Sequence, residues 1–172
     1  MPLSWSDAMY EVLHTNPIFN VIDKNGHFVV AEPFECNGAM VAPRDPAGNY
    51  ILVEQLRKAI GQVSLEFPRG KHDPDETIEK TARREVMEEM GYEVDQLVVL
   101  GKLHTNNSIV QSHMMLFAGI GAKRVTDVTD GEVIREVKYS PKELLTQVTS
   151  GKITDSHTLS AITFMLANGT FF

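Results

Sequence analysis

Three glutamates of this chain, Glu85, Glu88 and Glu89, have the spacing i, i+3 and i+4 within a stretch of helical periodicity. At about 100° per residue they share one arc of the helix, and Glu89 falls at the margin of its apolar stripe, which consists of Ile78, Ala82, Val86 and Met90. Like charges one turn apart destabilise a helix by roughly 0.2–0.5 kcal/mol, and partial burial adds a desolvation penalty. A hard divalent cation with oxygen ligands would relieve both. The spacing therefore favours a metal site over a solvated charged surface.

The flanking residues predict how this helix begins and ends. Gly70, Asp73 and Pro74 mark a turn before it, and either Asp75 or Thr77 can cap its first turn. Gly91, directly after Met90, is the usual left-handed stop. Arg84 lies one turn from Glu88 and can pair with it, but one guanidinium cannot neutralise three carboxylates. We therefore expect both this ion pair and a metal site.

The stretch from Gly70 to Tyr92 resembles, position for position, the signature of the Nudix hydrolases. The matching positions are Gly70, Glu76, Arg84, Glu85, Val86, Glu88, Glu89, Gly91 and Tyr92. Only Tyr92 departs, because it is aromatic where the family prefers an aliphatic residue. The resemblance implies that Glu85, Glu88 and Glu89 bind Mg²⁺, with Mn²⁺ as the alternative, and that Glu88 also belongs to the catalytic set. It assigns structural roles to Gly70, Glu76, Arg84 and Gly91.

Weaker similarity to the ADP-ribose and nucleoside-diphosphate-sugar branch of this family extends over most of the remaining chain. It implies that Arg57, Glu66 and Arg69 contact the substrate, and that the backbone carbonyl of Arg69 is a further metal ligand. A bidentate guanidinium suits phosphate binding. The alternative for Arg57 is an ordinary ion pair with Glu54 or Glu66.

The resemblance implies a metal-dependent hydrolase that cleaves the pyrophosphate of ADP-ribose or a nucleoside-diphosphate sugar. One residue departs from the branch: its ADP-ribose hydrolases usually carry a Pro about sixteen residues past the signature, where this chain has Ser108. Hydrolysis of damaged nucleoside triphosphates or of dinucleotides therefore stays open as the alternative. A binding module that does not cleave its nucleotide is the third interpretation, although such modules commonly lose one or more of the glutamates that this chain keeps.

The general base is expected outside the helix, because a carboxylate that holds a cation accepts protons poorly. The polar segment Lys123–Val133 contains Asp130 and Glu132 with Gly131 between them. We predict Glu132 as the base, because its longer side chain adjoins a strand that fixes its direction, and Asp130 as a residue that tunes the field. The alternative is that both are solvated loop acids.

Composition fits one globular domain, because 42% of the 172 residues are hydrophobic. The formal net charge of −7 argues against non-specific nucleic-acid binding, and it means that a polyphosphate substrate needs cations to approach. No apolar run of roughly 18 residues predicts a membrane span, and the N-terminal MPLSWSDAMYEVLH lacks the pattern of a secretory signal. The single cysteine, Cys36, excludes an internal disulfide, so we expect a reducing, cytoplasmic setting.

The expected fold is α/β, the Nudix α/β/α sandwich of a mixed sheet between helices, with an N-terminal β-hairpin extension. Residues 1–35 would form the extension and residues 36–172 the hydrolase domain. Strands Phe19–Ile22 and Phe28–Glu32 flank Asp23-Lys24-Asn25-Gly26, which is a hairpin signal. In the similar branch this hairpin packs on a partner subunit, so the resemblance implies a homodimer. The alternative is a sheet extension in a monomer.

The remaining elements follow from alternating apolar runs and from capping signals. Ser140 with Glu143 forms a capping box ahead of one helix that ends at Gly151, and Asp155 caps a final helix that ends at Asn168-Gly169. The other predicted strands are Ala39–Ala42, Tyr50–Glu54, Leu97–Leu100, Met114–Ile120 and Ile134–Tyr139.

Overall fold

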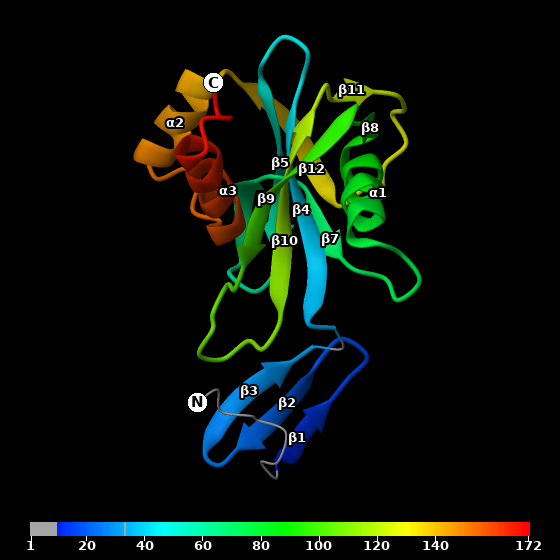
Figure 1. Cartoon of the computed structure of the whole chain (residues 1–172), viewed down its shortest axis with the longest axis vertical. Helices are drawn as coiled ribbons and strands as arrows, with labels where there is room; N and C mark the ends of the chain where they lie inside the picture. Colours follow the sequence, from blue (N-terminus) through cyan, green and yellow to red (C-terminus); the bar gives the residue numbers. More distant parts are fainter. Residues whose placement is uncertain (1–9, 33) are drawn as a thin grey trace.

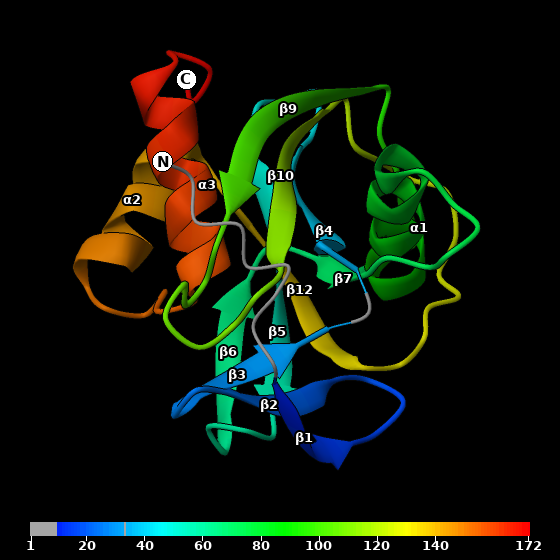
Figure 2. The same cartoon turned by 60° about the horizontal axis from the view of Figure 1, so that its bottom comes forward.

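A computed structural model describes residues 10–32 and 34–172, so the first nine residues of the predicted extension and of the N-terminal segment MPLSWSDAMYEVLH lie outside the described part. A mixed sheet stands between helix α1 on one side and helices α2 and α3 on the other, and a smaller sheet lies at one end of it (Figure 1 and Figure 2). The predicted α/β/α sandwich is therefore confirmed. The helices are α1 (Ile78–Met90), α2 (Pro141–Thr149) and α3 (Ser156–Ala167).

The main sheet runs in the order β12-β5-β4-β10-β9, with β6 paired to β5 and β7 paired to β4. Strands β4 and β10 are parallel and the other pairs are antiparallel, as expected for a mixed sheet. A separate two-stranded ribbon joins β8 and β11, so the polar segment Lys123–Val133 begins with a short strand. The strands are β4 (Cys36–Arg44), β5 (Tyr50–Arg57), β6 (Gln62–Glu66), β7 (Arg69–Lys71), β8 (Tyr92–Glu93), β9 (Gln96–Leu103), β10 (His113–Ile120), β11 (Lys123–Arg124) and β12 (Val133–Tyr139).

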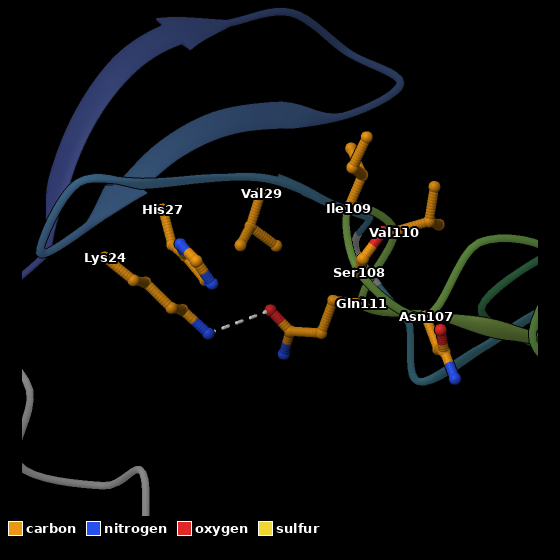
Figure 3. A pocket seen from close by; sticks show the side chains of 8 residues that line it. All are labelled: Lys24, His27, Val29, Asn107, Ser108, Ile109, Val110 and Gln111. Carbon is orange, nitrogen blue, oxygen red and sulfur yellow. Dashed lines mark hydrogen bonds between the residues drawn. The ribbon is translucent and has the colours of Figure 1, made fainter.

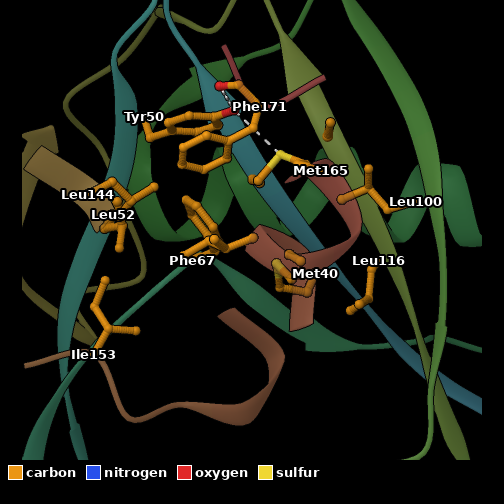
Figure 4. Close-up of a cluster of buried hydrophobic side chains, with 14 of the residues drawn as sticks. Met40, Tyr50, Leu52, Phe67, Leu100, Leu116, Leu144, Ile153, Met165 and Phe171 are labelled. Carbon is orange, nitrogen blue, oxygen red and sulfur yellow. Dashed lines mark hydrogen bonds between the residues drawn. The ribbon is translucent and has the colours of Figure 1, made fainter. Parts of the chain in front are cut away.

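Alternation along β5 divides the core into two clusters, one on each face of the sheet. Tyr50 and Leu52 pack toward α2 and α3, where the Tyr50 hydroxyl donates to the carbonyl oxygen of Phe171 at 2.9 Å (Figure 4). Ile51 and Val53 face the opposite way and share a cluster with the apolar stripe of α1. Since successive strand residues point to opposite faces, the next residues of β5 continue these two rows. This parity decides which polar residues of β5 face α1.

The smaller sheet contains three strands, β1 (Glu11–Thr15), β2 (Asn20–Lys24) and β3 (His27–Ala31), in that order. The predicted hairpin is confirmed as β2 and β3, and β1 is an additional strand that the sequence did not reveal because all five of its residues are exposed. Strand β3 also contacts the segment before β10: the Val30 amide donates to the Ile109 carbonyl at 2.7 Å, and the Gln111 amide donates to the Val30 carbonyl at 3.0 Å. The small sheet is thereby joined to the main domain.

Local signals set the ends of α1 as the sequence predicted. Of the two candidate caps, Thr77 is used, and its hydroxyl accepts from the Lys80 amide at 3.3 Å. Gly91 ends the helix with φ of 70°, and a Cβ there would lie 2.0 Å from the Thr126 carbonyl oxygen. Only glycine therefore fits, both because of its left-handed backbone and because the following loop packs against it. The Val125 amide donates to the Gly91 carbonyl at 2.9 Å, which ties that loop to the end of α1.

Candidate active site

Arg84 is the centre of the polar network on α1. Its Nη1 donates to Glu85 at 2.7 Å and to Glu88 at 2.8 Å, its Nε donates to Glu76 at 3.0 Å, and its Nη2 donates to the Lys71 carbonyl at 2.7 Å. Burial alone lowers the pKa of this guanidinium, but the hydrogen bonds with Glu76 and Glu88 outweigh burial and raise it. Arg84 and Glu76 thus fasten the turn before α1 to the helix, and Arg84 fixes the direction of two of the three glutamates.

Gly70 lets the backbone of β7 approach Glu85 closely. A Cβ at this position would lie 2.0 Å from the Glu85 Oε2 atom. Strand β7 is held there because Gly70 is paired with Ala39 of β4. The glycine is therefore required by the carboxylate of α1, which agrees with its predicted structural role.

The three glutamates differ in burial. Glu85 and Glu89 are 8% and 5% exposed, whereas the Glu88 side chain is 47% exposed. Burial, reinforced by the charge of Glu85, raises the pKa of Glu89 to about 8. Burial likewise raises the pKa of Glu85, although Arg84 opposes the shift. Two buried acids one turn apart thus repel each other in the absence of a cation, as the spacing predicted.

The carboxyl group of Glu89 provides a test of whether these residues fit a metal. Its Oε2 atom is buried, and no hydrogen-bond partner for it occurs in the described part of the chain. A buried oxygen without a donor is costly, and a hard cation would satisfy it. In residues 10–32 and 34–172, however, no group of three or more acidic, His or Cys side chains forms a ready metal cluster. Because Arg84 contacts both Glu85 and Glu88, a cation would have to displace or share these contacts.

A second polar cluster surrounds Glu66, which is 1% exposed. Arg57 Nε donates to its Oε1 at 2.7 Å, while Ser64 and Arg69 donate to its Oε2 at 3.2 and 3.3 Å. The ion pair of Arg57 is therefore with Glu66, whereas Glu54 is bound by Arg135 at 2.7 Å. Two guanidinium groups are thus held side by side by one buried carboxylate.

Arg57 and Arg69 also line a cavity of about 340 Å³, together with Gly70 and Lys71 from the start of the signature. Glu32, which follows β3, and Asn37 of β4 also line it. With 30% and 20% of their side chains exposed, the two arginines remain accessible from this cavity. Their contact with substrate phosphates stays a prediction.

A larger cavity of about 490 Å³ lies between the small sheet and the loop before β10, and Ser108 is among its lining residues (Figure 3). Its polar side chains include Lys24, which donates to Gln111 at 3.4 Å. No carboxylate is among the described residues that line it. We therefore place the chemistry at the smaller cavity, because its lining residue Gly70 packs against Glu85 of α1.

The loop between β11 and β12 brings one of its two predicted acids to α1. The Asp130 amide donates to the Glu88 carbonyl at 2.8 Å, and the Asp130 charge contributes to the raised pKa of both Glu85 and Glu89. Asp130 also accepts from the Glu132 amide at 2.9 Å, so its carboxylate shapes the turn. Glu132 is exposed and directly precedes β12. The described residues thus place Asp130 beside the glutamates and Glu132 next to Asp130.

Asp155 joins the Glu66 cluster, a role that its capping position alone did not reveal. It caps α3 by accepting from the Thr158 amide at 2.8 Å, and it also accepts from Arg69 at 3.2 Å. Burial alone raises the pKa of this carboxyl, but the hydrogen bond from His157 and the charge of Arg69 outweigh burial and hold the pKa well below its ordinary range. Helix α3 is therefore coupled to the arginine that lines the cavity.

We expect Asp155→Asn to reduce stability by about 2 kcal/mol at pH 7, because Asn retains the cap but not the ion pair. A carboxyl whose pKa is lowered by folding stabilises the protein above its unfolded-state pKa of about 3.9, and this contribution is lost as pH falls further. The difference between wild type and variant should therefore shrink below about pH 4. Urea unfolding at pH 7 and pH 3 measures it. An equal difference at both pH values would contradict a role for the Asp155 charge.

A family profile and several known proteins are similar to this chain in sequence. Residues 36–160 match the profile of the NUDIX domain. The methanol dehydrogenase activator of Bacillus methanolicus is 28% identical over 118 residues, which cover 67% of this chain and 64% of that protein. The ADP-ribose pyrophosphatase of Bacillus subtilis (strain 168) is 28% identical over 123 residues, covering 69% and 65%. The chain therefore spans slightly less than two thirds of the length of these two relatives.

A third relative is similar over a longer range. The GDP-mannose pyrophosphatase of Yersinia enterocolitica is 29% identical over 165 residues, covering 88% of this chain and 86% of that protein. A solved structure described as an ADP compounds hydrolase aligns with a TM-score of 0.76 at 21% identity, covering 94% of each chain. At this identity the structural match shows the fold. In the described part of the chain, no helix is sufficiently long and apolar to cross a bilayer.

Proposed function

Because the chain belongs to the NUDIX domain family, we propose that it is a metal-dependent hydrolase that cleaves the pyrophosphate bond of a nucleoside diphosphate joined to a sugar. ADP-ribose or a nucleoside-diphosphate sugar is the substrate class. The observation that carries this proposal is a pair of buried carboxylates on α1, Glu85 and Glu89, of which Glu85 packs against Gly70. Gly70 lines the same cavity as Arg57 and Arg69. Relatives that act on ADP-ribose and GDP-mannose support the choice of substrate.

In the proposed reaction Glu85, Glu88 and Glu89 hold Mg²⁺ or Mn²⁺, together with the backbone carbonyl of Arg69. When bound, such cations polarise phosphoryl oxygens and lower the pKa of a bound water. Arg84 orients Glu85 and Glu88 through the hydrogen bonds described above.

The substrate's two phosphates would lie against Arg57 and Arg69, which Glu66 holds side by side. A guanidinium is suited to contact two phosphate oxygens at once. Glu132 takes the proton of the attacking water, and the products are a nucleoside monophosphate and a sugar phosphate. The water supplies the oxygen and both protons, so the reaction needs no further reactant.

The small N-terminal sheet is proposed to pack on a second copy of the chain. Its strand β1 is exposed at all five positions, which include Val12 and Leu13 at 51% and 47% exposure. Exposed apolar side chains on an edge strand favour pairing with another chain. Light scattering or sedimentation of the purified protein would distinguish the homodimer from a monomer with a sheet extension.

A substrate panel tests the proposed activity. Purified protein with Mg²⁺ or Mn²⁺ should hydrolyse ADP-ribose or an ADP- or GDP-sugar in preference to dinucleotides and to canonical or oxidised nucleoside triphosphates. The products, separated by chromatography, should be the nucleoside monophosphate and the sugar phosphate. A kcat/KM that is much larger for triphosphates or dinucleotides would establish the alternative hydrolase. Tight binding without turnover would instead indicate a binding module.

A further inference from the structure

Gln55 on β5 is a buried amide whose polar atoms are both unsatisfied. It is 3% exposed, and neither its Oε1 nor its Nε2 has a hydrogen-bond partner among the described residues. Leaving a buried polar group without a partner costs roughly 1–3 kcal/mol, so a purely structural position would favour an apolar side chain of similar size. Among the described residues, both polar atoms of this amide are thus left available to a bound water or ligand.

The parity of β5 places this amide on the same face as α1. Ile51 and Val53 pack with the apolar stripe of α1, and Gln55 and Arg57 follow them on the same side of the strand. Across the strand pair, Gln55 is opposite Ser64, whose hydroxyl donates to Glu66. Along this face of β5, Gln55 thus lies between the apolar residues that pack against α1 and Arg57, which belongs to the charged cluster around Glu66.

A second buried atom without a hydrogen-bond partner lies on α1, the helix that packs against this face of the sheet. Glu89 Oε2, from α1, is also buried and without a partner in the described chain. Val86 and Met90, which lie three residues before and one residue after Glu89 on α1, pack in one cluster with Ile51 and Val53 of β5. Glu89 is therefore buried against the same face of β5 as Gln55. The Gln55 amide and the Glu89 carboxylate, each more than nine-tenths buried, therefore lie between β5 and α1. No described residue hydrogen-bonds to the Gln55 amide or to Glu89 Oε2.

A hydrated cation would satisfy both groups. The carboxylate of Glu89 would be its ligand, and the amide of Gln55 can accept a hydrogen bond from a water of its coordination shell or donate one to a carboxylate. A neutral amide suits this place because another carboxylate would add to the repulsion between Glu85 and Glu89. Groups that hydrogen-bond to metal ligands orient them, and their loss weakens metal binding.

We propose that Gln55 is a positioning residue of the cation site, where its side-chain amide hydrogen-bonds to the hydrated divalent cation held by Glu85 and Glu89. This inference rests on the proposed metal-dependent function. It assigns Gln55 no contact with the substrate, so its loss should reduce cation affinity and kcat while KM for the nucleotide at saturating cation changes little.

The test is calorimetric titration with Mn²⁺ in the absence of nucleotide. Gln55→Met, which keeps the volume and removes the amide, should bind Mn²⁺ about 10- to 100-fold more weakly than wild type. Its metal-free form should be at least as stable as wild type, because an unsatisfied amide has been removed. Gln147→Met on α2, a half-buried glutamine on the other side of the sheet, is the matched control and should bind like wild type.

Gln55→Glu gives a second test, the rise in melting temperature on adding Mn²⁺. This rise would be the same as in wild type if Gln55 had only a structural role. The extra carboxylate should lower the melting temperature of the metal-free protein, and saturating Mn²⁺ should raise it by more than in wild type. If wild type binds Mn²⁺ and Gln55→Met binds it equally well, the assignment of Gln55 is overturned while the proposed function stands. If wild type does not bind Mn²⁺ at millimolar concentration, the proposed function itself fails, and the inference fails with it.

Discussion

Glu89→Gln is expected to lower kcat about a thousandfold while the fold is retained, because one ligand of a catalytic cation contributes several kcal/mol to transition-state stabilisation. Gln has the same size and removes a carboxylate that is 5% exposed and repelled by Glu85. The variant should also bind Mn²⁺ more weakly. Glu79→Gln, at an exposed glutamate in the first turn of the same helix, is the matched control and should keep wild-type activity.

The stability of Glu89→Gln checks the physical reason. Burial raises the pKa of Glu89 to about 8, well above an unfolded-state value of about 4.3. A carboxyl whose pKa is raised by folding favours the folded state at low pH, and this contribution is lost as pH rises between those two values. Without metal, wild type should therefore lose stability relative to Glu89→Gln between about pH 4 and pH 8. Urea unfolding with a chelator at pH 5 and pH 8 measures the change.

Two outcomes would contradict this account of Glu89. Near wild-type hydrolysis by Glu89→Gln at saturating Mg²⁺ would show that Glu89 is not a ligand of the catalytic cation. A difference in stability that does not vary with pH would show that the carboxyl is not desolvated as the geometry of α1 indicates.

The second large effect is expected at the loop before β12. Glu132→Gln should lower kcat by roughly 10²–10⁴ with little change in KM, which is the usual size of a general-base effect. Asp130→Asn should have a smaller effect, because Asn still offers an oxygen to the Glu132 amide and thus keeps the turn. The backbone hydrogen bond from Asp130 to the Glu88 carbonyl is unaffected by either change.

Kinetics of both variants with the preferred nucleotide separate the two acids. Asp127→Asn is the control on the same loop, because its side chain is 94% exposed and pairs only with Arg124 in the described residues. A large loss of kcat in Asp130→Asn with an active Glu132→Gln would reverse the assignment. If both variants stay active, the base is elsewhere, with Glu66 or a glutamate of α1 as the next candidate.

Features that depend on near neighbours along the chain could be predicted from the amino-acid sequence. The stop at Gly91 and the ion pair of Arg84 with Glu88 involve residues within a few positions of each other, so helical geometry alone brings them together. The sequence offered Asp75 or Thr77 as the cap, and the structure shows that Thr77 is used. The turn residues Asn25 and Gly26 likewise predicted the hairpin of β2 and β3. The apolar stripe of α1 placed Glu89 at the buried margin of the helix, and the structure confirms its burial.

Contacts between residues far apart in the sequence could not be predicted, because they depend on how the strands and helices pack together. The hydrogen bond from Arg69 to Asp155 joins positions 86 residues apart, and no local pattern distinguishes Asp155 from an ordinary helix cap. The antiparallel pairing of β5 with β6 and the packing of α1 on β5 bring Arg57, Glu66 and Glu89 to one side of the sheet. A glutamine in a strand gives no sign in the sequence that it will be buried, so Gln55 became visible only once both strands beside it were in place. Sequence patterns fix the ends and faces of elements, whereas the side chains that meet between elements depend on how long loops close and which strands pair.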